Sequence, residues 1–189
     1  MAKKNVKHKS KRIPLPGDVP EKARIDAMIR VNHAGEYGAK RIYQGQLAVL
    51  RGKASAPVIQ HMAEQEEKHL RYFNDAIVTR GVRPTVLSPV WHVLGFALGA
   101  GTAMLGEKAA MACTVAVEEV IDEHYRKQVD TLGEEEKELK ATIEQFRKEE
   151  LEHRDTGLSH HAEEAPAYFA LTQAVKATSR LAIWLSTRF

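Results

Sequence analysis

Residues 59–73 read IQHMAEQEEKHLRYF, and this stretch decides the fold. Its apolar residues recur at intervals of three and four, which is the pattern of one buried face of an α-helix. Glu66 and His69 fall on that face, because Glu66 follows Met62 by four residues and His69 precedes Phe73 by four. A helix that only packs has no use for an ionisable pair on its apolar face. The stretch therefore indicates a helix with a buried site.

The same pattern returns in residues 143–157, which read IEQFRKEELEHRDTG. Glu150 follows Phe146 by four residues, and His153 comes three residues later, so this pair also lies on an apolar face. Residues three apart are neighbours on a helix surface. The chain thus carries two Glu-x-x-His motifs on two predicted helices.

Two further predicted helices each place one glutamate on their apolar face. Glu36 stands seven residues before Tyr43, and Glu118 stands seven before Tyr125, so each glutamate shares a face with a large side chain. The first glutamate precedes its Glu-x-x-His motif by 30 residues and the second by 32. The sequence therefore reads as a glutamate followed by a Glu-x-x-His motif, twice.

Four carboxylates on apolar faces predict a bound cation. Buried ionised carboxylates cost several kcal/mol each unless they are paired or bind a metal, and the alternative of solvated helix faces conflicts with the apolar pattern. One glutamate from each of two helices and a Glu-x-x-His motif from each of two others form the di-iron site of ferritin-like bundles. We therefore expect an all-α, ferritin-like four-helix bundle with six metal ligands, which are Glu36, Glu66, His69, Glu118, Glu150 and His153.

The ligand types favour two iron ions. Two divalent irons balance four carboxylates, and carboxylates with imidazoles and no thiolate suit iron or manganese better than copper or zinc. Glu66 and Glu150 are expected to bridge the metals, with one remaining glutamate and one histidine at each. Each histidine is expected to donate its second ring N–H to an acceptor. Asp122, one turn after Glu118, is a candidate acceptor, and an ordinary surface aspartate is the alternative.

The apolar spacing predicts helices throughout the chain and little strand, because few segments alternate with period two. The expected helices span residues 20–50, 55–81, 89–104, 106–132 and 134–158, and a last helix follows Pro166 to Phe189. Asp18 is the expected cap of the first helix. We expect residues 1–19 to form a basic, disordered arm and residues 20–189 to form a single ferritin-like di-iron domain.

Composition excludes several classes of protein. The chain has 189 residues, 43% of them hydrophobic, which suffices for one core. The single cysteine, Cys113, excludes a disulfide framework, a cysteine zinc site, a rubredoxin-like domain and a four-cysteine iron–sulfur cluster. Six basic side chains lie in residues 1–12, which leaves 22 basic against 25 acidic residues elsewhere. This balance argues against nucleic acid as a partner.

Two segments suggest contact with lipid. Residues 85–106 carry no formal charge, but one proline, a histidine and four glycines make them a poor membrane span. Residues 165–189 form an amphipathic segment with three basic residues, no acid and Trp184, which is typical of helices in a headgroup layer. We expect both segments to form additional apolar helices at a membrane interface, and docking on the bundle is the alternative for the last one.

Several strings resemble the demethoxyubiquinone hydroxylases of ubiquinone biosynthesis. They are NHAGE (32–36), QEEKH (65–69), RPTVL (83–87), WHVLGFALGAGTA (91–103), AMACTVAVEE (110–119), EELEH (149–153) and APAY (165–168). The resemblance spans residues 23–189, and the family's six ligand positions fall on the six residues that the apolar faces select.

The resemblance implies a peripheral membrane di-iron monooxygenase that hydroxylates the ring of demethoxyubiquinol with O2. It also implies that His124 and Tyr125 form a catalytic pair near the metals that delivers electrons and protons. Periodicity alone makes Tyr125 a core residue and leaves His124 unassigned. The implied partners are a polyprenyl benzoquinol, O2, an electron donor that the sequence does not identify, membrane lipid and other proteins of ubiquinone biosynthesis.

Two other functions share these ligands. Di-iron quinol oxidases of the alternative-oxidase type reduce O2 to water, and ferritin-like iron-binding proteins have no oxygenase activity, while a purely structural bundle binds no metal. The lysine-rich start favours the cytoplasmic face of a bacterial inner membrane. The matrix face of the mitochondrial inner membrane is the alternative.

Overall fold

The computed structural model describes residues 17–189, and this part of the chain is helical without strands. The helices are α1 (Glu21–Leu50), α2 (Ala56–Arg80), α3 (Ser88–Met104), α4 (Glu107–Thr131), α5 (Lys137–Ser159) and α6 (Tyr168–Arg188). Short 3-10 helices cover Glu134–Glu136 and Ala162–Glu164. The all-α prediction is confirmed, and the expected boundaries differ by at most three residues. Most of the expected N-terminal arm, residues 1–16, lies outside the described residues.

The ends of α2 follow the signals in the sequence, whereas the start of α1 does not. Pro57 occupies the first turn of α2, and Gly81 ends that helix at φ +63°, with its N–H bonded to the carbonyls of Ile77 and Val78. The cap expected at Asp18 is wrong: Pro20 occupies the N-cap of α1, and it makes no side-chain capping hydrogen bond. The rigid φ of proline already suits a helix start.

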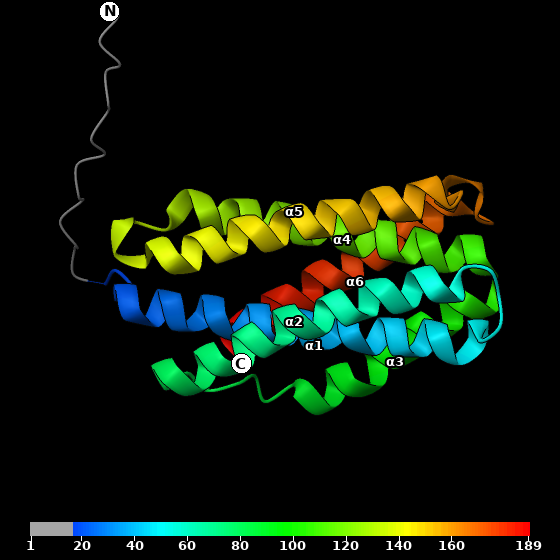
Figure 1. Ribbon diagram of the computed structural model, residues 1–189. Helices are drawn as coiled ribbons and strands as arrows, with labels where there is room; N and C mark the ends of the chain where they lie inside the picture. Colours follow the sequence, from blue (N-terminus) through cyan, green and yellow to red (C-terminus); the bar gives the residue numbers. More distant parts are fainter. Residues whose placement is uncertain (1–16) are drawn as a thin grey trace, which may run out of the picture.

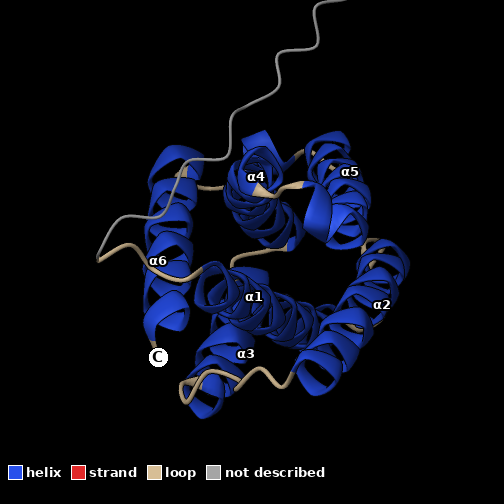
Figure 2. Cartoon of the chain, turned by 90° about the vertical axis from the view of Figure 1, so that its left-hand side faces the viewer, coloured by secondary structure: helices blue, strands red, loops and turns tan. Residues whose placement is uncertain are grey.

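Four of the helices surround the predicted site. Figure 2, viewed along the helices, shows α1, α2, α5 and α4 at the corners of a bundle, with α3 and α6 outside it beside α1. Figure 1 shows the same helices running lengthwise, with α4 and α5 paired on one side. Helix α1 packs against α2, α3 and α6, and α4 packs against α5 and α6. Helix α1 therefore borders the bundle interior on one face and the two outer helices on others.

Glycines bring α3 into backbone contact with α1. A Cβ atom on Gly99 would lie 1.9 Å from the carbonyl oxygen of Ile42, and one on Gly45 would lie 2.2 Å from that of Phe96. No larger residue fits at either position without separating the helices. Within the uncharged segment, Gly95 and Gly99 thus serve close helix packing.

The outer helices expose apolar side chains. Val93 and Leu94 on α3 are 62% and 54% exposed, and Leu181 and Trp184 on α6 are 55% and 50% exposed. Among residues 17–189, no helix combines the length and hydropathy needed to cross a bilayer.

Candidate metal centre

The structure brings all six predicted ligands together in the bundle interior. Helix α1 supplies Glu36 and α4 supplies Glu118, while α2 and α5 each supply a Glu-x-x-His pair. Each of the six residues is at most 3% exposed. One apolar cluster containing Ile29 and Phe73 lies on one side along the helices, and another containing Met62 and Met111 lies on the other. The site is therefore closed to water along the bundle axis.

The six residues form two overlapping groups. One group is Glu36, Glu66, His69 and Glu150, and the other is Glu66, Glu118, Glu150 and His153. Within each group, one ligand atom from every residue lies within 4.8 Å of the others. Glu66 and Glu150 belong to both groups, which is the arrangement expected of two bridging carboxylates.

Both histidines turn Nδ1 toward the carboxylates. His69 Nδ1 lies 3.1 Å from Glu150 Oε1 and 3.6 Å from Glu36 Oε2. His153 Nδ1 lies 3.1 Å from Glu66 Oε1 and 3.2 Å from Glu150 Oε2. Nδ1 is thus the ring atom that each histidine offers to a metal.

The other ring nitrogen of each histidine meets an acceptor on the opposite helix. His69 Nε2 lies 2.6 Å from Glu149 Oε2, and His153 Nε2 lies 2.9 Å from Gln65 Oε1. These contacts confirm that each imidazole has an outer acceptor, which fixes its tautomer and orientation. Asp122 is not that acceptor, because its carboxylate receives a hydrogen bond from Arg147 Nε at 2.6 Å. The expectation that Asp122 accepts a hydrogen bond from a ligand histidine is therefore wrong, and Asp122 forms an ion pair with Arg147 instead.

Two tyrosines cross the bundle to bind the remaining glutamates. Tyr43 on α1 donates its hydroxyl to Glu118 at 3.0 Å, and Tyr125 on α4 donates to Glu36. Helical periodicity predicts that both tyrosines lie on apolar faces, but it does not predict the hydrogen bond from Tyr43 to a glutamate. The available signal was the seven-residue spacing from glutamate to tyrosine, which is the same in both helices.

Electrostatics make this cluster depend on cations. Burial, reinforced by the charge of Glu150, raises the pKa values of Glu66 and Glu118 well above their usual range. Burial acts in the same direction on Glu150, but hydrogen bonds from His153 and His69 outweigh it and lower its pKa to about 2. Burial disfavours charged imidazoles, yet the surrounding carboxylates raise the pKa of His69 to about 12 and that of His153 to about 11. Protons therefore compensate the carboxylates wherever a metal does not.

Glu66 supplies the clearest test of whether a metal fits. Both of its carboxylate oxygens are buried, and within the described residues neither receives a hydrogen bond. His153 Nδ1 is near one of them, but not in hydrogen-bond geometry. Buried polar atoms normally have hydrogen-bond partners. Since Glu66 belongs to both ligand groups, two bound cations would provide them.

His124 and Tyr125 occupy different surroundings. Tyr125 reaches Glu36 directly. His124 instead contacts Gln128 Nε2 at 2.7 Å and Asn32 Oδ1 at 3.3 Å, and Gln128 and Asn32 also bond to each other. Burial lowers the pKa of His124 to about 4, so this imidazole is neutral near pH 7.

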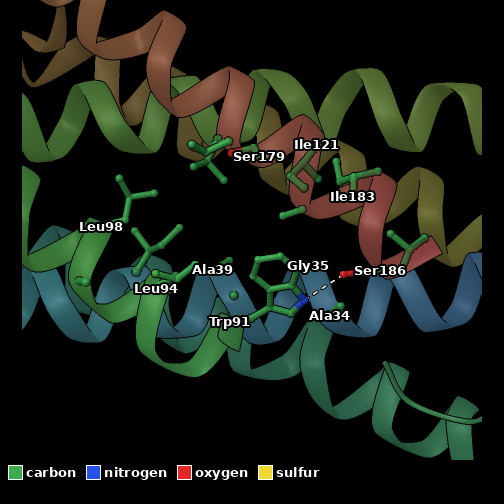
Figure 3. A pocket seen from close by; sticks show the side chains of 18 residues that line it. Ala34, Gly35, Ala39, Trp91, Leu94, Leu98, Ile121, Ser179, Ile183 and Ser186 are labelled. Atoms are coloured by element: carbon green, nitrogen blue, oxygen red, sulfur yellow. Dashed lines mark hydrogen bonds between the residues drawn. The ribbon is translucent and has the colours of Figure 1, made fainter. Parts of the chain in front are cut away.

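An apolar cavity of about 380 Å³ lies on the other side of α1. Figure 3 shows it lined by residues of α1, α3, α4 and α6, among them Gly35, Leu98 and Ile183. A second space, too narrow to hold a water molecule, borders it: Ala39, Ile42 and Val117 line both spaces, and Tyr43 and Glu118 line the second. The cavity therefore lies next to residues that border a predicted ligand carboxylate. The sequence predicts the apolar helix over residues 89–104 but not the cavity beside it.

Comparison with known proteins bears on the reaction. A family model described as ubiquinone biosynthesis protein COQ7 matches residues 23–186. The 3-demethoxyubiquinol 3-hydroxylase of Rhodospirillum rubrum is 59% identical over 175 residues, covering 92% of this chain and 82% of its own. The mitochondrial NADPH-dependent 3-demethoxyubiquinone 3-hydroxylase of Homo sapiens is 58% identical over 171 residues, covering 88% and 79%. The mitochondrial 5-demethoxyubiquinone hydroxylase of Saccharomyces cerevisiae is 43% identical over 181 residues, covering 87% and 78%.

Proposed function

The chain belongs to the COQ7 family of ubiquinone biosynthesis proteins, and from this we propose that it hydroxylates the ring of a demethoxyubiquinol with O2. The observation that carries the proposal is an apolar cavity whose lining residues Ile42 and Val117 also border the space beside Glu118 of the buried carboxylate cluster. A lipophilic aromatic substrate needs an apolar site, and oxygen activation needs a redox metal. The bundle provides a place for each, separated by one helix.

The proposed cofactor is a pair of iron ions in a ferritin-like bundle formed by residues 20–189. Glu36 and His69 would hold one ion, Glu118 and His153 the other, and Glu66 and Glu150 would bridge them. The shared membership of the two bridging residues and the unpartnered oxygens of Glu66 support this assignment. The chemistry that bound iron supplies is the reductive activation of O2. Donation by Tyr43 and Tyr125 holds the terminal glutamates in place.

The proposed reaction replaces a ring C–H bond of the quinol by C–OH. One oxygen atom of O2 enters the product, and the other leaves as water after uptake of two electrons and two protons. We place the ring at the end of the cavity that Ile42 and Val117 line, next to Glu118, and the polyprenyl tail in the rest of the cavity. Cavity walls without charged groups exclude water and make no hydrogen bond to the tail, so they act through shape and apolar contact.

His124 and Tyr125 are proposed to deliver electrons and protons to the metals. The hydrogen bond from Tyr125 to Glu36 supports this role for Tyr125, and the adjacent position of His124 on α4 supports the pair. The human relative is named as NADPH-dependent, so NADPH is the first electron donor to test.

We also propose that α3 and α6 hold the protein on a membrane surface. Their exposed apolar side chains are accompanied on α6 by Lys176, Arg180 and Arg188, and the Arg188 guanidinium lies over the Trp184 ring. Such helices bind the boundary between headgroups and acyl chains. The relatives include a bacterial protein and proteins named as mitochondrial, so the inner membrane of either is the proposed location. Other proteins of ubiquinone biosynthesis are the proposed partners there.

The test is conversion of demethoxyubiquinol by purified, iron-loaded protein under ¹⁸O2. We expect one labelled oxygen in the hydroxylated product and no conversion by Glu150→Ala. The matched control is Glu152→Ala, which removes an exposed glutamate from the same helix. Consumption of O2 with water as its only product would overturn the proposal in favour of a quinol oxidase, and normal conversion by Glu150→Ala would overturn the metal assignment.

A further inference from the structure

A single hydrogen bond joins the two outer helices across one end of the cavity. The indole Nε1 of Trp91 on α3 donates to the hydroxyl oxygen of Ser186 on α6 at 2.9 Å, as the dashed line in Figure 3 shows. Both residues line the cavity, and Ser186 is only 2% exposed. The bond therefore lies in apolar surroundings, where a donor or acceptor left without a partner is costly.

The C-terminal half of α6 lies over the cavity and has few other attachments. This half-helix faces the cavity with Thr178, Ser179, Ala182 and Ile183. On that side it therefore has few packing contacts. Within the described residues, its other side-chain link to a neighbouring helix is the exposed pair of Arg180 and Glu123 at 3.4 Å. Exposed ion pairs of this kind contribute little. The bond to Trp91 is thus the main polar restraint on this half-helix.

The bond also lies at the end of the cavity that is farther from the carboxylates. Helix α6 runs antiparallel to α1 (Figure 1). Ser186 and Trp91 border the cavity beside Ala34 (Figure 3), whereas the space beside Glu118 begins at Ile42. Leu94 and Leu181, on the two helices that the bond connects, are exposed. Separation of these helices would therefore open the cavity toward an apolar surface.

We propose that the hydrogen bond between Trp91 and Ser186 is a clasp that closes the cavity over the polyprenyl tail of the substrate and opens to let the tail enter and leave. This inference rests on the proposed function, because it takes the tail as the occupant. Clasp closure slows exchange of long-tailed quinones, and it does not affect a quinone whose short tail ends before Trp91. Trp91 and Ser186 are therefore specificity-determining residues for tail length and do not touch the reacting atoms.

The test measures how fast quinones dissociate from the iron-loaded protein in detergent. An octaprenyl benzoquinone and a benzoquinone with one isoprene unit are displaced separately, and recovery of tryptophan fluorescence reports release. We expect Ser186→Ala to speed release of the octaprenyl quinone by about fivefold, the equivalent of one net hydrogen bond, and to leave the short quinone unchanged. Trp91→Phe should do the same, with Trp184 as the remaining reporter, and the double variant should match either single variant.

Thr187→Val is the matched control. It removes a hydroxyl from the residue next to Ser186, and that hydroxyl donates to the carbonyl of Ile183 within its own helix. Circular dichroism establishes that each variant is folded. Equal acceleration for both quinones, additive effects in the double variant or a Ser186→Ala rate equal to that of Thr187→Val would overturn the clasp. Wild-type protein that shows tail-dependent release but no hydroxylation would instead overturn the proposed reaction alone.

Discussion

The pair α1 and α2 and the pair α4 and α5 build the carboxylate cluster from the same types of ligand in the same order. Glu36, Tyr43 and Gln46 on α1 correspond to Glu118, Tyr125 and Gln128 on α4, each 82 residues later. The contacts are crossed: each tyrosine binds the glutamate of the other helix, and each histidine Nε2 contacts the residue before the motif glutamate on the other helix. Each half therefore completes the ligand set of its partner.

The two halves differ where α1 and α4 face the outer helices. Helix α1 carries Gly35, Gly38 and Ala39, whereas the positions 82 residues later on α4 hold Val117, Val120 and Ile121. The small residues line the apolar cavity, and a Cβ atom on Gly38 would meet no side chain and no backbone of another helix within 4 Å. The repeated residues thus build the candidate metal centre, and the unrepeated ones build the path to it.

The largest expected effect comes from removing a ligand that both groups share, compared with removing a ligand that belongs to one group. Glu66→Ala removes a residue common to both ligand groups, so metal analysis should find almost no iron. Turnover should fall by more than about 100-fold, which exceeds the usual loss when only a hydrogen-bond partner of a metal ligand is removed. Glu36 belongs to one ligand group, so Glu36→Ala should retain about one metal per chain. Equal metal content in the two variants would contradict the shared role of Glu66.

The cavity predicts the next largest effect. Gly38→Leu fills open space on α1 without a backbone clash, so we expect KM for a long-tailed quinol to rise about tenfold or more while the protein stays folded. Ala48→Leu adds the same side chain at an exposed position of α1 and should leave KM unchanged. An unchanged KM for Gly38→Leu would place the tail elsewhere.

The two tyrosines test whether the halves differ in function. Tyr43→Phe and Tyr125→Phe each remove one hydrogen bond to a terminal glutamate, so both should weaken iron binding by about tenfold in a metal titration. Tyr125→Phe should also lower kcat at saturating iron, because Tyr125 is proposed to carry electrons and protons with His124. Identical kcat values in the two variants would remove that role.

The smallest expected effect concerns the acceptors of the histidines. Glu149→Gln keeps a hydrogen bond to His69 but removes the negative charge that makes the imidazole a stronger metal ligand. Iron affinity should therefore fall about threefold, which is less than the loss expected when the hydrogen bond itself is removed. Gln65→Glu places the missing charge beside His153 and should raise affinity slightly. Changes of the same sign would show that the two acceptors are not equivalent.

The sequence predicted the ligands because helical periodicity reports which side chains share a face. Glu66 and His69 are identifiable from Met62 and Phe73 alone. The crossed contacts of Tyr43, Glu149 and Gln65 were missed, since they depend on how two helices separated by about 80 residues are aligned. The cavity was missed for a related reason: a void is the sum of small residues on several helices, and no single segment reveals it.

The unpartnered oxygens of Glu66 have a consequence for the life of the protein in a cell. A ligand that binds only the folded chain stabilises it by mass action, and here the ligand would also complete the hydrogen-bonding and charge balance of the core. Newly made chains that find no metal would unfold more often and be degraded sooner. The abundance of the protein would then follow the supply of metal, without any dedicated regulator.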